Sequence, residues 1–305
     1  MTALTVIILT RDEALHIKRA IASVTGFAQR IVVVDSGSTD DTVALARAAG
    51  AEVLQNAWVN YATQFNWALG QIRDQPGWVL RLDADEVVSP TLAREIAAGL
   101  PDVDGLTVPR RIMFQGQMIR FGGVGRVPAL RLFRNRAGHC EDRWMDEHII
   151  VDGPVAALKG ELIDDNRKSL GWWIEKHNSY ASREAVDLLN LRYGFLPLRD
   201  TPPANRTAAI KRWIKIRVYA WLPGGIRAGL YFFYRYLLCA GCLEGKLARR
   251  FHVLQGFWYR YLVDAKLADV QRCMQMTGAD APRAIEMVLG IDVTGSGKAK
   301  ASKAA

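Results

Sequence analysis

WVLRLDADEVVS, residues 78–89, places three acidic side chains in four positions directly after a run that is typical of a buried strand. Asp83, Asp85 and Glu86 would repel one another and lose hydration if they were crowded together without a counter-charge. The stretch therefore predicts either an acidic loop in water at the open end of a strand or a cation held between the acids.

The first hundred residues alternate between strand-like runs and helical patterns. The strand-like runs are LTVIIL (4–9), RIVVVD (30–35), AEVL (51–54) and WVLRLD (78–83). Apolar residues recur at helical spacing between them, with Thr10 or Asp12 available to cap the first helix. Ser89 and Pro90 are typical of the start of the fourth helix. This alternation predicts an α/β fold with a mostly parallel, Rossmann-like sheet and helices on both faces.

Later parts of the chain have other patterns. Short strand-like runs between residues 105 and 162 predict antiparallel or mixed additions to the sheet, and residues 168–192 predict one long helix. The expected organisation is a catalytic domain (1–193), a linker (194–205), a helical region (206–290) and a disordered tail (291–305).

Acidic residues follow three of the predicted strands, and this recurrence is more informative than any one acid. In open parallel sheets, ligands bind beyond the carboxyl ends of the strands. The Asp12–Glu13 pair, Asp35 and the Asp83–Asp85 pair all fall at such ends. Two carboxylates one residue apart suit Mg²⁺ or Mn²⁺, which could in turn hold the phosphates of a substrate. A solvated acidic loop is the alternative.

Three segments together resemble the family 2 glycosyltransferases, which have the GT-A nucleotide-sugar fold. They are VIILTRDEALHIKRAIAS (6–23), IVVVDSGSTDDT (31–42) and WVLRLDADEVVS (78–89). The likeness extends over nearly the whole chain and is greatest to bacterial enzymes that add sugars to lipopolysaccharide core or related envelope glycans. It implies an inverting, metal-dependent hexosyltransferase with Mg²⁺ or Mn²⁺, a nucleotide-sugar donor (a UDP-sugar first among them) and a lipid-linked saccharide acceptor.

The resemblance also implies roles for individual residues. It assigns the donor nucleotide to Thr10, Glu13, Asp35, Ser36, Gly37 and Asp83, and the metal to Asp85. Among these, Asp35 would hydrogen-bond the base, and Asp83 would lie near the ribose and diphosphate. Asp12 departs from the family, which often has asparagine there, so a direct ligand contact from residue 12 is not expected.

Inverting transfer needs a base that takes the proton from the attacking acceptor hydroxyl. The resemblance points to the segment HCEDRWMDEHI and favours Glu147, then Asp146, with Glu141 and Asp142 behind them. The residues alone do not separate these neighbours, and a solvated loop is an equal interpretation for Glu141 and Asp142.

Other polar residues near these motifs have two interpretations each. Tyr61 and Gln64 open the third helix, where they could meet an anion or lie on the surface. Arg131 and Arg134 lie on one predicted strand but three positions apart, so they cannot share a face. One of the two arginines is expected near a diphosphate and the other in solvent.

The positive charge of the chain is concentrated near its C-terminal end. The formal net charge is +9, and residues 206–272 hold thirteen Lys and Arg against three Asp and Glu, with thirteen of the aromatic residues. Cations interleaved with aromatic side chains are typical of a segment that lies on an anionic membrane surface. The alternative is that the aromatic residues pack on the catalytic domain. The first apolar run is too short for a signal peptide. We therefore expect a cytoplasmic protein, peripheral on the cytoplasmic face of the inner membrane.

Two other functions stay open at this point. A sugar transferase acting on polyprenyl phosphate would need no strong base, because its acceptor is already an anion. A nucleic-acid-binding protein could use the basic block, although this interpretation gives no reason for acids at three strand ends and no nucleic-acid partner is expected.

Overall fold

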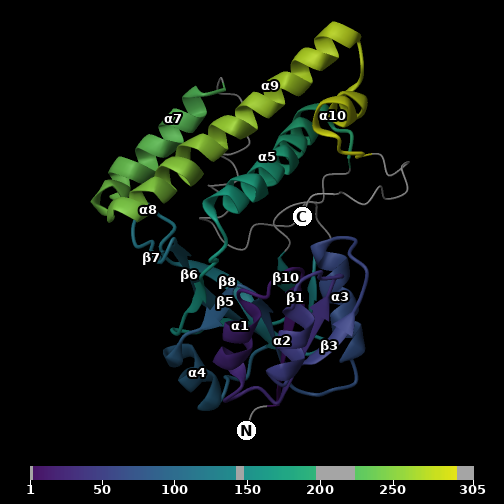
Figure 1. Cartoon of the computed structure of the whole chain (residues 1–305), viewed down its shortest axis with the longest axis vertical. Helices are drawn as coiled ribbons and strands as arrows, with labels where there is room; N and C mark the ends of the chain where they lie inside the picture. Colours follow the sequence, from purple (N-terminus) through teal and green to yellow (C-terminus); the bar gives the residue numbers. More distant parts are fainter. Residues whose placement is uncertain (1–2, 142–147, 197–223, 294–305) are drawn as a thin grey trace. The chain divides into compact units, whose positions relative to one another are not determined.

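The structure, a computed structural model, describes residues 3–141, 148–196 and 224–293. It divides into two compact units, Met1–Lys168 and Ser169–Ala305 (Figure 1). The helix over residues 170–193 falls within the second unit, although the sequence pattern groups it with the catalytic domain. The two units are described separately below.

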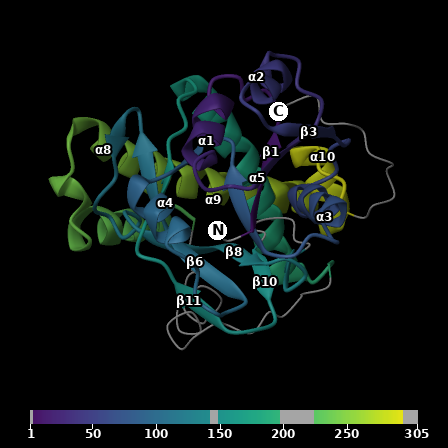
Figure 2. The ribbon, with the colours of Figure 1, turned by 90° about the horizontal axis from the view of Figure 1, so that it is seen from below.

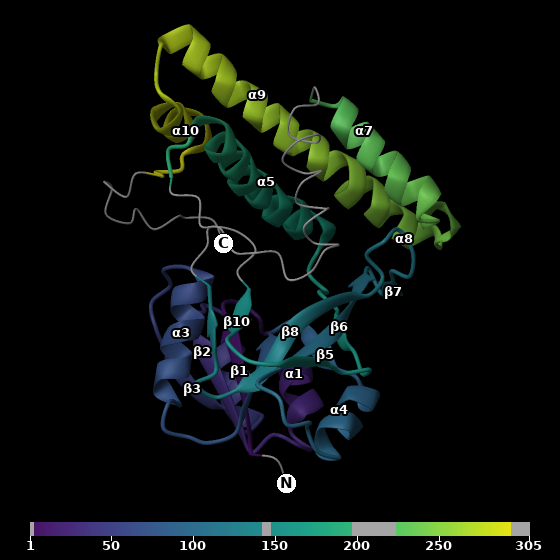
Figure 3. The same cartoon turned by 180° about the vertical axis from the view of Figure 1, so that it is seen from behind.

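The first unit is built on a mixed sheet whose strand order is β3-β2-β1-β4-β8-β6-β12-β5, with β7 and β11 also paired to β6. Its N-terminal strands are β1 (Leu4–Thr10), β2 (Arg30–Asp35), β3 (Glu52–Gln55) and β4 (Trp78–Asp83). These four strands are parallel, as the alternating pattern predicts. The remaining strands are β5 (Glu86–Val88), β6 (Gly105–Phe114), β7 (Gln117–Met118), β8 (Val127–Arg134), β11 (Val155–Ala157) and β12 (Leu162–Asp164). Strand β8 is antiparallel to both β4 and β6, so the added half of the sheet is mixed, as predicted. Figure 3 shows the long β6–β8 pair and the small β7 strand beyond it.

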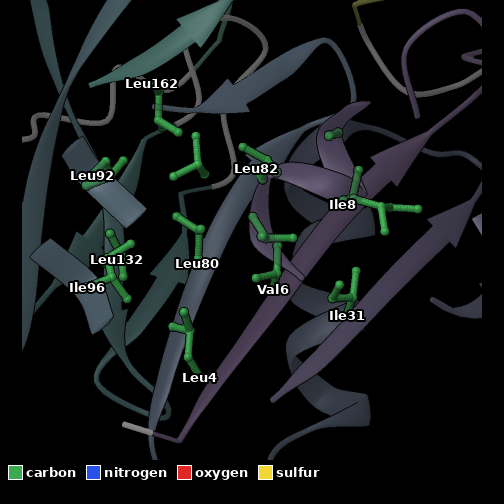
Figure 4. Close-up of a cluster of buried hydrophobic side chains, with 14 of the residues drawn as sticks. Leu4, Val6, Ile8, Ile31, Leu80, Leu82, Leu92, Ile96, Leu132 and Leu162 are labelled. Atoms are coloured by element: carbon green, nitrogen blue, oxygen red, sulfur yellow. The ribbon is translucent and has the colours of Figure 1, made fainter. Parts of the chain in front are cut away.

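Helices cover both faces of this sheet (Figure 2). One face packs on α1 (Ile17–Val24), α2 (Thr42–Ala48) and α4 (Pro90–Ala97). The other packs on α3 (Tyr61–Gln71) and on the small β9 (Gly138–Cys140) and β10 (Ile149–Val151) pair. Figure 4 shows the first core, in which alternate residues of β1 and β4, such as Val6 and Leu80, belong to the same buried cluster as Leu92 and Ile96 of α4. Strands covered on both sides explain the continuous apolar runs in the sequence.

The starts of two helices test the predicted caps. Ser89 caps α4 as expected, its Oγ accepting a hydrogen bond from the backbone N–H of Leu92 at 3.2 Å. The prediction that Thr10 or Asp12 caps the first helix is wrong, because α1 begins at Ile17. Asp12 has a left-handed backbone, with φ of 53°, and its carboxylate accepts from the backbone N–H of Thr39. The loop after β1 is thus held by the loop after β2.

The second unit is helical in its described parts. It contains α5 (Leu170–Tyr193), α7 (Ile226–Phe233), α8 (Lys246–Phe251), α9 (Tyr259–Thr277) and α10 (Ala281–Leu289). Wide π-helical turns form η2 (Tyr234–Leu238) and η4 (His252–Trp258), and η3 (Gly241–Leu243) is a short 3₁₀ turn. Helices α5 and α9 lie side by side (Figures 1 and 3). In the described part of the chain, we find no helix whose length and apolar character would allow it to cross a bilayer.

Candidate functional site

The carboxyl ends of β1, β2 and β4 lie at the same edge of the sheet. Thr10 is the register partner of Asp35, and Leu9 is the register partner of Asp83. The prediction that the acidic residues after these strands gather at one edge is therefore confirmed for Asp35 and Asp83. This edge is the candidate site, and the remaining candidate residues surround it.

Asp35 is fully buried, and its carboxylate is occupied by its own surroundings. One oxygen accepts from the backbone N–H groups of Gly37 and Ser38, both at 3.0 Å. The other accepts from the hydroxyls of Ser38 (2.5 Å) and Thr10 (3.3 Å). Gly37 has φ of 88°, a conformation that favours glycine. Asp35 thus fixes the loop that carries Ser36 and Gly37, and the predicted contact with a base requires one of these donors to be displaced.

Gln64 supports the same loop from α3 and is buried, not on the surface. Its Nε2 donates to Ser36 Oγ (3.2 Å) and to the backbone oxygen of Asn56 (3.0 Å), while its Oε1 accepts from Asn56 Nδ2 (2.8 Å). The one signal for this role in the sequence is a glutamine that falls among the apolar positions Ala62, Phe65 and Ala68 of the helix.

Glu13 is held by two basic side chains. Its Oε1 accepts from Lys168 Nζ at 2.8 Å, and its Oε2 lies 2.5 Å from His16 Nδ1. Burial would raise the pKa of Glu13, but the bonds from His16 and Lys168 hold it below the ordinary value. The buried His16 accepts the backbone N–H of Arg167 at Nε2, so its proton is assigned to Nδ1. Glu13 is therefore an ionised carboxylate that ties the loop after β1 to the segment after β12.

Two arginines supply the counter-charge of Asp83, which is 28% exposed. Arg131 Nη2 donates to its Oδ2 at 3.0 Å, and Arg81 Nε lies 3.7 Å from Oδ1. The hydroxyl of Tyr61 donates to Oδ1 at 2.9 Å. Burial alone would raise the pKa of Asp83, but the charges of Arg131 and Arg81 hold it well below the ordinary value. Asp83 is thus ionised and oriented without any added cation.

Glu86 shares the same arginine from the other side. Only 1% of its side chain is exposed, and its Oε1 accepts from Arg131 Nη2 at 2.6 Å. Its Oε2 accepts the backbone N–H of Asp83 at 3.0 Å. Burial raises the pKa of Glu86 to about 8 in spite of the charge of Arg131. Glu86 is a buried support for the turn, and Arg131, which is also buried, is the arginine that meets the acids. Arg134 instead pairs with the exposed Asp102.

Asp85 lies between these two acids in sequence and is partly exposed. Its Oδ2 accepts from Asn166 Nδ2 at 2.9 Å, and its backbone oxygen accepts the N–H of Asp165 at 3.0 Å. Within residues 3–141, 148–196 and 224–293, no group of three or more His, Cys, Asp or Glu side chains is arranged to hold a metal ion by itself. Among the described residues, no arginine forms an ion pair with Asp85, in contrast to Asp83 and Glu86.

The favoured candidates for the catalytic base are not among the described residues. Glu147, Asp146 and Asp142 fall outside the described residues. Glu141, the remaining alternative, follows β9, and its backbone N–H donates to the oxygen of His148 at 2.9 Å. The choice among the four acids stays a prediction.

Parts of the chain are similar to known glycosyltransferases. The family model described as glycosyl transferase family 2 matches residues 5–143, the part that carries β1, β2, β4 and their loops. An uncharacterized glycosyltransferase of Rickettsia typhi is 40% identical over 280 residues, which cover 87% of this chain and 95% of that protein. The lipopolysaccharide core biosynthesis glycosyltransferase LpsC of Rhizobium meliloti is 31% identical over 212 residues, 66% of this chain and 77% of LpsC.

Two further matches are shorter. An uncharacterized glycosyltransferase of Rickettsia felis is 42% identical over 96 residues, 32% of this chain and a third (33%) of that protein. A solved structure of glucosyl-3-phosphoglycerate synthase from Mycobacterium tuberculosis, in complex with Mn²⁺ and UDP, is 22% identical with a TM-score of 0.30. That match covers 36% of this chain and 44% of the solved chain.

The match to the Rickettsia typhi relative over almost its whole length and the family match over the acidic edge lead to one conclusion. The chain belongs to the family 2 glycosyltransferases, and its first unit has their GT-A fold.

Proposed function

We propose that this protein transfers a hexose, with inversion, from a nucleotide diphosphate donor to a lipid-linked saccharide in the synthesis of lipopolysaccharide core or a related envelope glycan. The observation that carries the proposal is the turn from Asp83 to Glu86. Two arginines hold Asp83 as an anion at the open edge of the sheet, while Asp85 stays partly exposed beside it. The likeness to LpsC supports the choice of acceptor class.

The residues of the turn fit a divalent cation bound together with its substrate. Mg²⁺ is often held by one or two carboxylates with phosphate oxygens completing the shell. Asp85 would hold Mg²⁺ or Mn²⁺ in this way, because none of the described arginines pairs with it and Asn166 already sets its orientation. When bound, the cation would neutralise the charge that develops on the departing nucleotide diphosphate.

The remaining edge residues would bind the donor. Ser36 and Gly37 are on the loop that Asp35 and Gln64 hold, so the loop has a fixed shape for a base. Thr10 and Glu13 begin the adjacent loop, and Asp83 is proposed to meet the ribose and diphosphate. A UDP-sugar is the first donor to test.

Glu147 is our proposed base, with Asp146 as the alternative. A saccharide hydroxyl must lose a proton as it attacks the anomeric carbon, so Glu147→Gln should lower kcat by a factor of about 100 or more. If the acceptor were polyprenyl phosphate, it would need no such base, and the same variant would keep its activity. We place the enzyme on the cytoplasmic face of the inner membrane, where a lipid-linked acceptor is available.

Calorimetric titration of UDP, GDP and dTDP, each with and without Mn²⁺, tests the donor site. Binding of one nucleotide should depend on the metal, and Asp85→Asn should abolish that dependence. Asp74→Asn is the matched control, because Asp74 is fully exposed and precedes β4, at the opposite end of that strand from the site. Failure of all three nucleotides to bind, with salt-sensitive binding to nucleic acid instead, would overturn the proposal.

A further inference from the structure

The first turns of the second unit after residue 223 have an inverted distribution of polarity. Large apolar side chains recur along one side of α7 and η2 and point to solvent. This stripe consists of Ile226, Leu230, Phe233, Tyr234, Leu237 and Leu238. They occupy positions i, i+4, i+7, i+8, i+11 and i+12, which lie on one helical face. Leu230 is 54% exposed and Leu238 is 69% exposed.

Arginines occupy the inner side of the same helix. Arg227 is buried in an ion pair with Asp264 of α9, and the carboxylate of Asp264 also accepts the backbone N–H of Gly225 at 2.9 Å. Arg235 is only 1% exposed and donates to Gln255. Its Nη2 lies 3.4 Å from Nδ1 of the buried His252. The π-helical turns η2 and η4 carry Arg235, His252 and Gln255 and bring them together.

This arrangement is the reverse of what water favours. In a water-soluble helix the leucines face the core, and arginine is rarely buried completely. In a membrane environment the preference changes, and ionisable side chains turn inward and pair while apolar ones face the acyl chains. An apolar stripe outside an interior that holds two buried arginines therefore favours contact of this surface with lipid.

Positively charged side chains lie close to the stripe in sequence and favour lipids with anionic headgroups. Lys246, Arg249 and Arg250 of α8 are exposed, directly after the exposed Leu243. Between residues 224 and 258, all of which the structure describes, the single acid is Glu244, and it is buried. The exposed charge of this part of the chain is therefore entirely positive, which favours anionic headgroups.

We propose that α7, η2, η3 and α8 form a lipid-docking face. The apolar stripe enters the acyl boundary of one leaflet, and the cations of α8 bind anionic headgroups beside it. The helices lie in the interface and do not cross the bilayer. The inference rests on the proposed function only in that a lipid-linked acceptor gives the docking a purpose. Its test needs no catalysis.

Flotation of the full chain with phosphatidylglycerol and phosphatidylcholine vesicles, prepared separately, tests the face. Leu230→Gln, Phe233→Gln and Leu237→Gln together should weaken partitioning into phosphatidylglycerol vesicles by roughly a hundredfold. The matched control is Leu191→Gln, Met276→Gln and Met287→Gln, three exposed apolar residues of the same unit outside the stripe, and it should partition like the wild type. Replacing Lys246, Arg249 and Arg250 by glutamine should lower the preference for phosphatidylglycerol over phosphatidylcholine by about fivefold per charge.

Several outcomes would overturn the proposal. One is equal partitioning of the stripe variant and the wild type. A second is a wild type that does not bind vesicles but forms a dimer, if the stripe substitutions dissociate that dimer. A third is a wild type that binds nucleic acid and not vesicles. Nucleotide titration on each variant reports separately on the donor site, so a chain that floats but binds no nucleotide refutes only the proposed function. If the triple variant does not fold, Leu230→Gln and Leu237→Gln alone should each weaken partitioning about fivefold.

Discussion

Replacing Arg131 with methionine removes the positive charge that Asp83 and Glu86 share. Arg131 Nη2 contacts both carboxylates, at 3.0 and 2.6 Å, from a fully buried position. Losing one partner of a buried ion pair typically costs roughly 3–5 kcal/mol, because the other charge is left in a poor environment. Since burial raises the pKa of Glu86 to about 8, Glu86 is already mostly protonated at pH 7, and the charge left without its partner is chiefly that of the partly exposed Asp83. We therefore expect the lower end of the range, about 3 kcal/mol at pH 7.

A second substitution shows whether this cost comes from Glu86. In Arg131→Met/Glu86→Gln no carboxylate is left at residue 86, and the glutamine oxygen can still accept the backbone N–H of Asp83. Because Glu86 is mostly protonated at pH 7, the losses of the two single variants should add within about 0.5 kcal/mol in the double variant. Arg134→Met is the control on the same strand. Its partner Asp102 is fully exposed, and the Arg134 guanidinium lies 4.6 Å from the centroid of the Trp78 ring, so the expected change is about 1 kcal/mol or less.

Hydrogen exchange of the β4 and β8 amides is the assay that we choose, because the chain has two units and one global transition is not assured. The free energy of opening at pH 7 is compared among the wild type, Arg131→Met, Glu86→Gln, the double variant and the Arg134→Met control. The reasoning is refuted if Arg131→Met costs no more than Arg134→Met. A double variant that loses about 1–2 kcal/mol less than the sum of the single losses would show that Glu86 carries a charge beside Arg131, which would contradict its raised pKa.

Three further predictions concern the same edge. Between pH 5 and 8 the folded chain keeps a proton on Glu86 that the unfolded chain has released, so stability should fall as pH rises by up to about 1.4 kcal/mol per unit. Glu86→Gln should remove this slope in denaturant titrations, and parallel curves would show that Glu86 is ionised throughout. Tyr61→Phe removes a donor to Asp83 and should weaken nucleotide binding about tenfold in calorimetry, whereas an unchanged Kd would separate Asp83 from the donor. Gln64→Leu leaves the side-chain amide and the backbone oxygen of Asn56 without their partner and should cost about 1–3 kcal/mol in urea unfolding. Gln64→Glu keeps only the acceptor and turns a buried carboxylate oxygen toward the Asn56 carbonyl, so it should not recover this loss, and a Glu variant as stable as the wild type would contradict the role of Nε2.

The sequence predicts the edge itself because two local rules suffice for it. Apolar runs and helical periodicity locate β1, β2 and β4, and parallel strands bring their carboxyl ends together. Asp35 and Asp83 follow directly from these rules. Local chemistry likewise suffices for the Ser89 cap.

The partners of these acids depend on contacts that no local pattern contains. Arg131 is 48 residues from Asp83, and it reaches that carboxylate through the antiparallel register of β8 against β4. The sequence alone therefore suggests a metal as the counter-charge of Asp83, whereas in the folded chain Arg131 supplies that charge. The late start of α1 has a similar cause, because Asp40 accepts the backbone N–H of Ala14, a bond that comes from the loop after β2.

The short turn between β4 and β5 is fixed by pairing on both sides. Asp83 is in register with Leu9, and Glu86 is in register with Asp164 of β12, so only two residues connect two strands that are anchored independently. An inserted or deleted residue would change the alternation of β5 and place Val87 or Asp85 where Glu86 now meets Arg131. The spacing of the acids is therefore a property of the sheet as much as of the ligand. Relatives that keep both pairings should show no gap between positions 83 and 86, even where the acids themselves have been replaced.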